Sequence, residues 1–444
     1  MRQTYQLEWA GKDLGQESRV ALGDINGDGI INIVAGTSAV SGSSYLHCFR
    51  FSEGRYHELA KVSLGEEDTR FIRVVDIDRD GRGEIIIGTN RGLCIYKMKG
   101  TQLVRIAEGY EIDGEVVSLA VADIDGDGRF EIVVAVKGRP RIYIYRYEVK
   151  LVFVRHEIFK ENVFCVAIGD TDGDSHPEVV VKTMASGGCR IHVTSFRGGH
   201  RVERWSGHIP GGGRSFLLVE DFDRCGRHEI ITDCTSRKVK VLCHRQNGYE
   251  LLWESPVFSY DPLDVACYDV DGDGQMELVV VGINTVHIYG WQSSGAVLEW
   301  SQTVPNGVFC VEAGRLMQKG YGEIILGTVY GYIYVLEPRR DKERGKLFVG
   351  KVQAIIQDTV TIPAGKPDAE RAVEAKARFS IDEVRVICDK VIVDGEVTAK
   401  ILYVAALPSQ PVHFFEATFP FLEFIHLYGA DPGMEALVFF KTEH

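Results

Sequence analysis

The chain has 444 residues, of which 45% are hydrophobic, so it can bury more than one core. Its formal net charge of −13 argues against nucleic acid as a partner, because phosphate binding needs a basic surface. We expect no membrane span and no secretory signal, because neither a run of about 18 apolar residues nor an N-terminal apolar core is present.

The first predicted element is a strand at residues 5–9. Its sequence, Tyr-Gln-Leu-Glu-Trp, is similar to two later segments, 249–253 and 296–300, which also end in tryptophan. Those two segments are the fourth strands of repeated units. We therefore expect 5–9 to serve as the fourth strand of a unit that lacks one of its own.

An acidic loop of nine residues follows and recurs along the chain. The copies are named loop 1 to loop 7 in chain order: 24–32, 76–84, 123–131, 170–178, 221–229, 269–277 and 315–323. Five copies carry Asp, Asn or Glu at positions 1, 3, 5 and 9: Asp24, Asn26, Asp28 and Asn32; Asp76, Asp78, Asp80 and Glu84; Asp123, Asp125, Asp127 and Glu131; Asp170, Asp172, Asp174 and Glu178; Asp269, Asp271, Asp273 and Glu277. Alternate oxygen ligands around a tight turn are what Ca²⁺ requires, so we predict several bound calcium ions.

The loops are not equally suited to an ion. Loops 3 and 6 are the strongest candidates, whereas loop 1 has two asparagines and loop 4 has Ser175 where the others have glycine. Loop 5 offers Cys225 to a hard cation and is expected to be empty, and loop 7 has lost every early ligand. The position-7 carbonyl would supply one further oxygen in each of the five acidic loops, from Ile30, Arg82, Arg129, His176 and Gln275.

The bound ions are expected to be structural. Three or four carboxylates in one loop repel each other, and a cation relieves that repulsion and fixes the turn. Mg²⁺ fits less well, because it prefers few carboxylates and keeps several waters. The alternative is a solvated Asp/Gly turn that stays free of metal.

Each loop joins two apolar, strand-like segments, and two more follow it. In the third unit these segments are 117–122, 132–136, 141–147 and 151–155. The units repeat every 46 to 52 residues, which is the length of a four-stranded blade, and their period-two alternation excludes a helical solenoid. The seven units predict an all-β, seven-bladed β-propeller over residues 1–338. In this ring, strand 5–9 would pair with the last strand, at 332–336.

These repeats resemble the FG-GAP/VCBS type found in the propeller of integrin α chains. The resemblance covers residues 1–338, and it implies calcium in loops between the first and second strands of some blades. The cysteines differ from those of secreted, disulfide-bonded integrins: ten are present, none in a C-x-x-C pair, and most lie in apolar strands. This pattern favours a reducing compartment and predicts a cytoplasmic protein.

A second domain is predicted after the repeats. Residues 339–346 form a charged linker, and 347–444 are β-rich but not repetitive. A hairpin is predicted to turn at Asp394-Gly395 and to return along 397–404. The following segment, 412–425, is aromatic, and alternation should bury about half of its rings. A partner-binding surface is the alternative for five of them: Phe414, Phe415, Phe419, Phe421 and Phe424.

This C-terminal region resembles the SPOCS domain of spore-coat and spore-morphogenesis proteins. The resemblance is carried by short blocks that keep their order: 389–397, 400–404, 411–414, 420–421 and 429–434. It implies protein–protein contacts with spore-coat or morphogenetic proteins. It also implies a location in the mother-cell cytosol or the spore coat.

The leading functional hypothesis is a non-enzymatic, calcium-binding scaffold of sporulation that docks partners through its C-terminal domain. A lectin-like propeller that binds glycan is the alternative, although the five tryptophans favour packing. A propeller hydrolase or lyase is a third hypothesis. It lacks support because the chain shows no G-x-S-x-G, H-E-x-x-H or phosphate-binding loop.

Overall fold

The computed structural model describes residues 5–338 and 361–426 apart from short gaps, together with Ala436 and Val438. The gaps are 12–13, 15–16, 39–42, 53–54, 110–111, 113, 198–199, 211, 235–236, 247, 293–294, 318–319 and 388–389. The predicted linker at 339–346 and the block at 429–434 therefore lie outside the described residues. The chain divides into two compact units, Met1–Arg339 and Arg340–His444.

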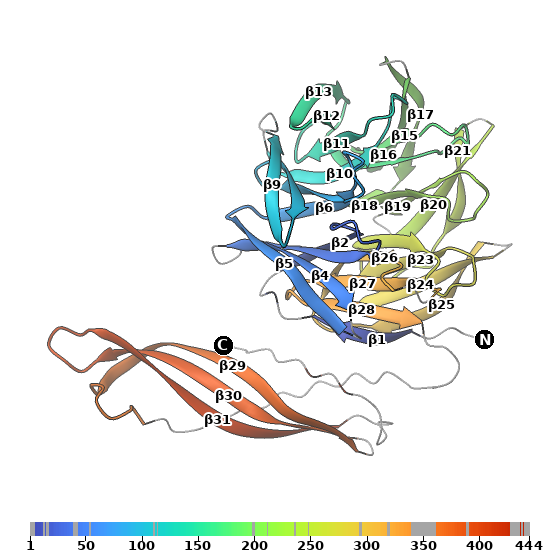
Figure 1. Ribbon diagram of the computed structural model, residues 1–444. Helices are drawn as coiled ribbons and strands as arrows, with labels where there is room; N and C mark the ends of the chain where they lie inside the picture. The colour runs from blue at the N-terminus through green and yellow to red at the C-terminus, as the bar shows by residue number, and fades with distance from the viewer. Residues whose placement is uncertain are drawn as a thin grey trace. The chain divides into compact units, whose positions relative to one another are not determined.

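The first unit consists of seven four-stranded antiparallel sheets that follow one another around a ring (Figure 1). Blades 1 to 3 contain β2 (Ser18–Gly23), β3 (Asn32–Thr37), β4 (Ser44–Ser52) and β5 (Arg55–Gly65); β6 (Thr69–Val75), β7 (Glu84–Thr89), β8 (Leu93–Lys99) and β9 (Gln102–Gly109); β10 (Val116–Ala122), β11 (Glu131–Val136), β12 (Arg141–Tyr147) and β13 (Leu151–Ile158). Blades 4 and 5 contain β14 (Val163–Gly169), β15 (Glu178–Ala185), β16 (Gly188–Arg197) and β17 (His200–Pro210); β18 (Gly212–Glu220), β19 (Glu229–Cys234), β20 (Lys238–Arg245) and β21 (Gly248–Glu254). Blades 6 and 7 contain β22 (Asp264–Tyr268), β23 (Glu277–Gly282), β24 (Thr285–Gln292) and β25 (Gly295–Thr303); β26 (Val308–Gly314), β27 (Glu323–Thr328), β28 (Ile333–Pro338) and β1 (Tyr5–Ala10).

The first strands of successive blades line the inside of the ring. Each contacts the first strand of the next blade, and β26 of the last blade contacts β2 of the first. The ring is also closed in sequence, because β1 pairs with β28, from Tyr5 opposite Pro338 to Ala10 opposite Tyr334. The prediction of an all-β, seven-bladed propeller is confirmed.

The core of the propeller lies between blades. Second strands such as β7 and β11 are buried along their whole length, which explains their unbroken apolar sequences. One buried cluster joins Val34 and Leu46 of blade 1 to Ile85 and Ile87 of blade 2. Adjacent sheets therefore stack face to face, while fourth strands such as β13 are partly exposed.

The second unit contains a three-stranded antiparallel sheet of β29 (Ala369–Ile387), β30 (Lys390–Ala405) and β31 (Val412–His426), with β30 in the centre. The prediction of a turn at Asp394-Gly395 is wrong, because β30 runs straight through both residues. Gly395 instead lies opposite a β-bulge of β29, where an added Cβ would be 2.1 Å from the Ser380 carbonyl oxygen. The glycine lets the backbones of β29 and β30 approach each other closely, and it does not form a turn.

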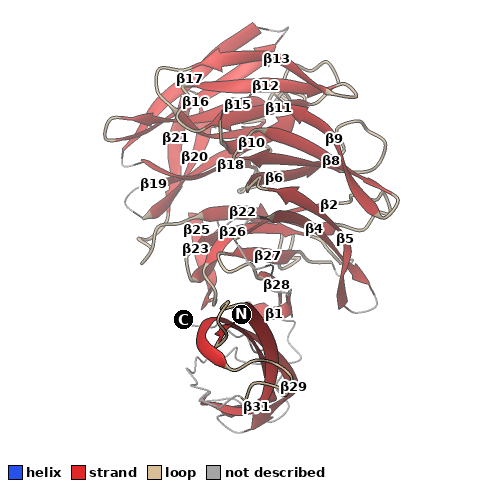
Figure 2. Ribbon diagram, turned by 90° about the vertical axis from the view of Figure 1, so that its left-hand side faces the viewer, coloured by secondary structure: helices blue, strands red, loops and turns tan. Residues whose placement is uncertain are grey.

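The described part of the chain contains strands and loops but no helix (Figure 2). It follows that no described helix is long and apolar enough to cross a membrane.

Candidate metal sites

The acidic loops share one backbone geometry, which loop 3 illustrates. Asp123, at position 1, accepts hydrogen bonds from the Gly126 and Gly128 amides, both at 2.8 Å. Asp127, at position 5, accepts one from the position-7 amide of Arg129 at 2.9 Å. The same bond is donated by the position-7 amides of the other four acidic loops: Ile30, Arg82, His176 and Gln275. The carboxylates thus satisfy amides that the tight turn leaves unbonded.

Position 9 has the same role in every loop. A side-chain oxygen there accepts a hydrogen bond from the position-2 amide, over 2.8 to 3.1 Å. The acceptors, each at most 2% exposed, are Asn32, Glu84, Glu131, Glu178, Glu229, Glu277 and Glu323. Because loops 5 and 7 keep this bond, position 9 has a structural role that does not depend on an ion.

Loop 4 keeps its shape without the usual glycine. Ser175 has a φ of 67°, in the left-handed region that Gly128 and Gly274 occupy in loops 3 and 6. A non-glycine residue in this region carries some strain. Its backbone amide still bonds Asp170, at 2.7 Å, so the acidic residues of loop 4 are held as in the other loops.

The structure brings the predicted side chains together into clusters that fit a cation. In loops 2, 3 and 4, oxygens from three acidic residues lie within 4.8 Å of one another: Asp76, Asp78 and Glu84; Asp123, Asp125 and Asp127; Asp170, Asp172 and Glu178. In loop 4 the Oε1 atom of Glu178 is buried and has no hydrogen-bond partner among the described residues. A buried carboxylate oxygen without a partner is costly, and a hard cation with oxygen ligands would satisfy it.

In loop 2, a lysine from the third strand already lies among the carboxylates. Lys97 Nζ, on β8, is 2.7 Å from Asp78, 2.9 Å from Asp80 and 2.5 Å from Glu84. Burial opposes the charged ammonium, but the hydrogen bonds that it donates to these three carboxylates raise the pKa of Lys97 above its usual value. The same contact lowers the pKa of Asp80.

Loop 3 contains a guanidinium in the equivalent place. Arg146, on β12, pairs with Glu131 across the ladder, so both side chains lie on one face of the sheet. Its nitrogens lie 3.2 Å from Asp125, 3.1 Å from Asp127 and 2.5 Å from Glu131. The sequence pattern of the loop gives no sign of this residue, because it lies 15 residues after the loop ends.

The remaining acidic loops differ from loops 2 and 3. Loop 1 is contacted by Arg50, whose Nη1 lies 2.7 Å from Asp28. In loop 4, Arg197 pairs with the exposed Asp174 at the loop tip. Glu178 and Glu277, at position 9 of loops 4 and 6, form no ion pair with a Lys or Arg among the described residues.

Among the acidic loops, loop 6 contains the carboxylate whose pKa is raised most, Glu277. Burial, followed by the nearby Asp271, raises the pKa of Glu277 to about 8. Burial also raises the pKa of Asp271 and of Glu299, a residue of the fourth strand β25 that faces the same carboxylates. Negative charge accumulates here, which is the condition that a bound cation would relieve.

Loops 5 and 7 lack a carboxylate at position 5, although loop 5 still brings ligand atoms of Asp221, Asp223 and Cys225 within 4.8 Å of one another. In loop 5, Cys225 is exposed, and burial and a hydrogen bond with Asp223 raise the pKa of its thiol to about 11. A protonated thiol is a poor ligand for a hard cation. In loop 7, residues 318–319 lie outside the described part of the chain.

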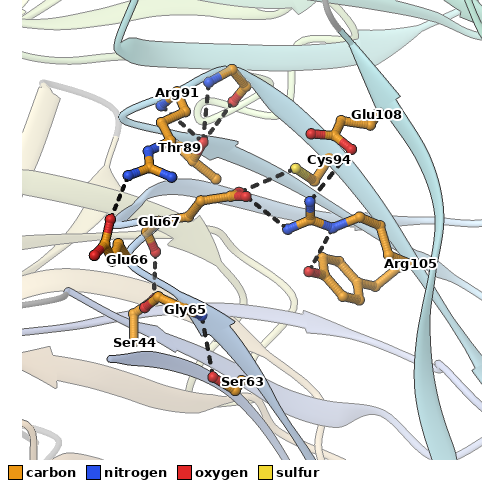
Figure 3. A network of polar contacts seen from close by, with 12 residues as sticks. Ser44, Ser63, Gly65, Glu66, Glu67, Thr89, Arg91, Cys94, Arg105 and Glu108 are labelled. Carbon is orange, nitrogen blue, oxygen red and sulfur yellow. Dashed lines mark hydrogen bonds and ion pairs between the residues drawn. The ribbon is translucent and has the colours of Figure 1, made fainter. Parts of the chain in front are cut away.

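Another acidic group shows how this fold neutralises carboxylates internally (Figure 3). Glu67, Cys94 and Glu108 lie close enough together to suggest a metal site. Arg105, however, lies 3.0 Å from Glu67 and 3.5 Å from Glu108, and its Nε donates to the Tyr96 hydroxyl at 2.9 Å. The arginine already supplies the positive charge in this group.

The structure also gathers ionisable residues on the inner ring that the sequence pattern does not single out. Arg73 of β6 lies 3.2 Å from Glu312 of β26, although blade 1 separates their blades. Burial raises the pKa of Glu312 to about 7, against the opposing effect of Arg73 and with the support of Asp264 and Glu220. Burial likewise raises the pKa of Glu220 to about 7. These residues converge because the first strands surround the axis.

Glu312 predicts a pH dependence of stability. Its pKa in the folded protein, about 7, lies above its ordinary value of 4.5, so the folded state holds a proton that the unfolded chain releases between these values. The free energy of unfolding should therefore fall as pH rises from about 4.5 to 7, and Glu312→Gln should flatten this fall. Urea unfolding across this range, with the exposed Glu66→Gln as control, measures it. An unchanged profile in Glu312→Gln would contradict the assignment.

The five tryptophans pack against other rings. Trp9 contacts Tyr56 at 4.6 Å between ring centroids, and Trp300 contacts Tyr5 at 5.3 Å. The other three pack against Tyr249, Phe222 and Tyr289. Glycan binding stays a prediction, and these contacts do not favour it.

Comparison with known proteins finds a family match in each of the two units. Residues 76–134 and 123–181 match the FG-GAP-like repeat, and residues 368–444 match the SPOCS domain of SipL. The crystal structure of BBS1N in complex with ARL6DN, soaked with lead, is similar, with a TM-score of 0.55 and 14% identity over 77% of this chain and 99% of that chain. A search of curated proteins finds no match.

The chain is thus a β-propeller in which residues 76–181 match FG-GAP-like repeats, followed by a region that matches the SPOCS domain, as the residues quoted from the sequence predicted. The SPOCS match begins at residue 368, later than the predicted start of that domain at 347. At 14% identity, the similarity to BBS1N concerns the fold alone.

Proposed function

We propose that this protein is a non-enzymatic scaffold of sporulation, whose calcium-stabilised propeller and C-terminal SPOCS domain bind protein partners. The observation that carries the docking role is an exposed apolar face on β31. Four side chains of this outer strand are 47% to 58% exposed: Val412, Phe414, Leu422 and Phe424. Such a row on an outer strand is typical of a surface that a partner covers.

The alternation along β31 divides the aromatic residues between core and surface. Phe415 and Phe421 are 7% exposed and pack beneath the sheet, whereas Phe414 and Phe424 lie on the opposite face. The buried rings belong to the hydrophobic core of this unit. The exposed rings are therefore available to a partner from the spore coat or its assembly machinery.

A pull-down from sporulating cells tests this role. The full-length chain should recover partners that a chain ending at Pro338 does not recover. A full-length Phe414→Asp, Phe424→Asp variant should lose the same partners, because a charge in an apolar interface opposes binding. Leu251→Asp with Val297→Asp is the matched control, since both residues are exposed apolar side chains of the propeller. Recovery of the same partners by the truncated chain would refute docking through the C-terminal domain.

Calcium is the second part of the proposal. The loops supply carboxylates in the spacing and number that suit this ion, and their backbone geometry is already formed. The ion would be held by the loop carboxylates and would neutralise their mutual repulsion. Its role is structural, since these residues form no acid–base arrangement around a cleft.

Calcium is expected to raise the melting temperature of the full-length protein, and chelation should lower it again. A ligand that binds the folded state alone stabilises it by about 2.7 kcal/mol at a hundredfold excess over its dissociation constant. Differential scanning calorimetry with calcium, magnesium or chelator measures the effect. A melting temperature that responds to neither calcium nor chelator would exclude structural calcium.

A further inference from the structure

The acidic loops differ in what balances their charge, and this difference goes beyond the loop motif. In loops 2 and 3, a cationic side chain from the third strand contacts carboxylates at positions 3, 5 and 9 together. In loops 4 and 6, the position-9 glutamate has no such contact among the described residues. The loops that look alike in sequence are thus electrostatically different.

We propose that Lys97 and Arg146 are built-in substitutes for calcium, and that calcium binding is confined to loops 4 and 6. The inference rests on the proposed calcium binding and deepens it. It also changes the ranking from the sequence, in which loops 3 and 6 were the two strongest candidates: loop 6 stays, and loop 4 takes the place of loop 3.

The first argument concerns space and charge in loops 2 and 3. The Lys97 ammonium contacts three carboxylates within 2.9 Å, so it lies where their oxygens converge. A divalent ion could enter this cluster only if it displaced the ammonium and broke three charge-assisted hydrogen bonds. Arg146 blocks loop 3 in the same manner, with 16% of its side chain exposed.

Loop 1 is excluded for a different reason. Its side-chain ligands include two amides, Asn26 and Asn32, and two carboxylates, Asp24 and Asp28. Arg50 already contacts Asp28 at 2.7 Å. Little negative charge remains to attract a divalent ion.

In blade 6, the third strand has a glycine at the ladder position opposite the loop glutamate. Gly290 pairs with Glu277, at the ladder position that Arg146 occupies opposite Glu131 in blade 3. A Cβ at Gly290 would lie 2.1 Å from Glu299 Oε1, so a glutamate from the fourth strand fills the space. The Oε2 atom of Glu299 is buried without a hydrogen-bond partner among the described residues. Blade 6 thus adds a carboxylate where blade 3 adds a cation.

Blade 4 has an uncharged residue across from the position-9 glutamate, and Arg197 of the same strand pairs with Asp174 at the loop tip and not with Glu178. Thr194 pairs with Val179, so the next residue, Ser195, stands across from Glu178. Ser195 accepts a hydrogen bond from Arg204 at 2.8 Å and brings no charge. The buried, unpartnered Oε1 of Glu178 remains beside Asp170 and Asp172.

Counting bound calcium ions per full-length chain, by equilibrium dialysis and calorimetric titration, tests the proposal. The unaltered chain should bind two ions. Lys97→Ser and Arg146→Ser should each create one further site, giving three ions, and the double variant should bind four. Arg129→Ser is the matched control, because Arg129 belongs to loop 3 but pairs with Glu148 outside the cluster. It should bind two ions.

Substitutions of the ligands locate the two ions independently of whether the first variants fold. Asp172→Asn and Asp271→Asn should each remove one ion, while Asp78→Asn and Asp125→Asn should leave the count at two. Four or five ions in the unaltered chain, or a lower count in Asp125→Asn, would overturn the inference and leave the calcium proposal intact. No bound calcium in any form would refute the calcium proposal itself.

Discussion

Replacing Lys182 by methionine is expected to lower the free energy of unfolding of the propeller by about 3 to 5 kcal/mol. Lys182, on β15 of blade 4, is completely buried and forms an ion pair with Asp233 on β19 of blade 5. Its ammonium also donates to the Phe216 carbonyl at 3.1 Å. The substitution would leave the Asp233 carboxylate, 3% exposed, in the interior without the ammonium that balances it.

Chemical denaturation followed by tryptophan fluorescence measures this loss. The double variant Lys182→Met, Asp233→Leu should recover most of the stability, because replacing both members of a buried ion pair with apolar residues is often close to neutral. Lys137→Met is the matched control, since Lys137 is 66% exposed and pairs with Glu115 at the surface. Its effect should stay below about 1 kcal/mol. A Lys182→Met variant as stable as the control would show that the ion pair does not hold blades 4 and 5 together.

Removing residues 1–10 is expected to destabilise the propeller strongly and to cause association between chains. This deletion takes away β1, which pairs with β28 along its length. It also removes Tyr5, which is 3% exposed, and Trp9, which packs against Tyr56. An unpaired β28 would present free backbone groups to other chains.

Calorimetry and size-exclusion chromatography at several concentrations test this prediction. A synthetic peptide of residues 1–11, added in trans, should restore part of the melting temperature by pairing with β28. Gln6→Ala, which removes one hydrogen bond to Glu337, is the control and should behave like the unaltered chain. A truncated chain that stays monomeric and melts as the full-length protein does would show that β1 is dispensable for ring closure.

The loops were predictable because their information is local. The Gly128 amide donates to Asp123, five residues earlier, and Glu131 accepts a hydrogen bond from the Ile124 amide, seven residues earlier. Contacts between residues so close in the chain can be recognised from the spacing of residue types in the sequence. Repetition at 46 to 52 residues then set the number of blades, and the fold could be predicted from it.

The turn at Asp394-Gly395 was mispredicted for a related reason. An Asp-Gly dipeptide commonly forms a hairpin turn, but a glycine in a strand can also mark a bulge. Its local sequence does not distinguish these cases. The choice depends on Ser380, whose carbonyl approaches Gly395 from the neighbouring strand.

By itself, the sequence determined the propeller, the position of its loops and the carboxylates in them, because each depends on residues close together in the chain. The tertiary structure alone decided which loops have an internal cation. Arg146 reaches Glu131 and Gly290 faces Glu277 through antiparallel pairing, since register places distant residues on one face of a sheet. The ring likewise brought Arg73 and Glu312 together over 239 residues. The charge balance of a loop depends on contacts with residues outside it, so it cannot be predicted from the spacing of residues within the loop.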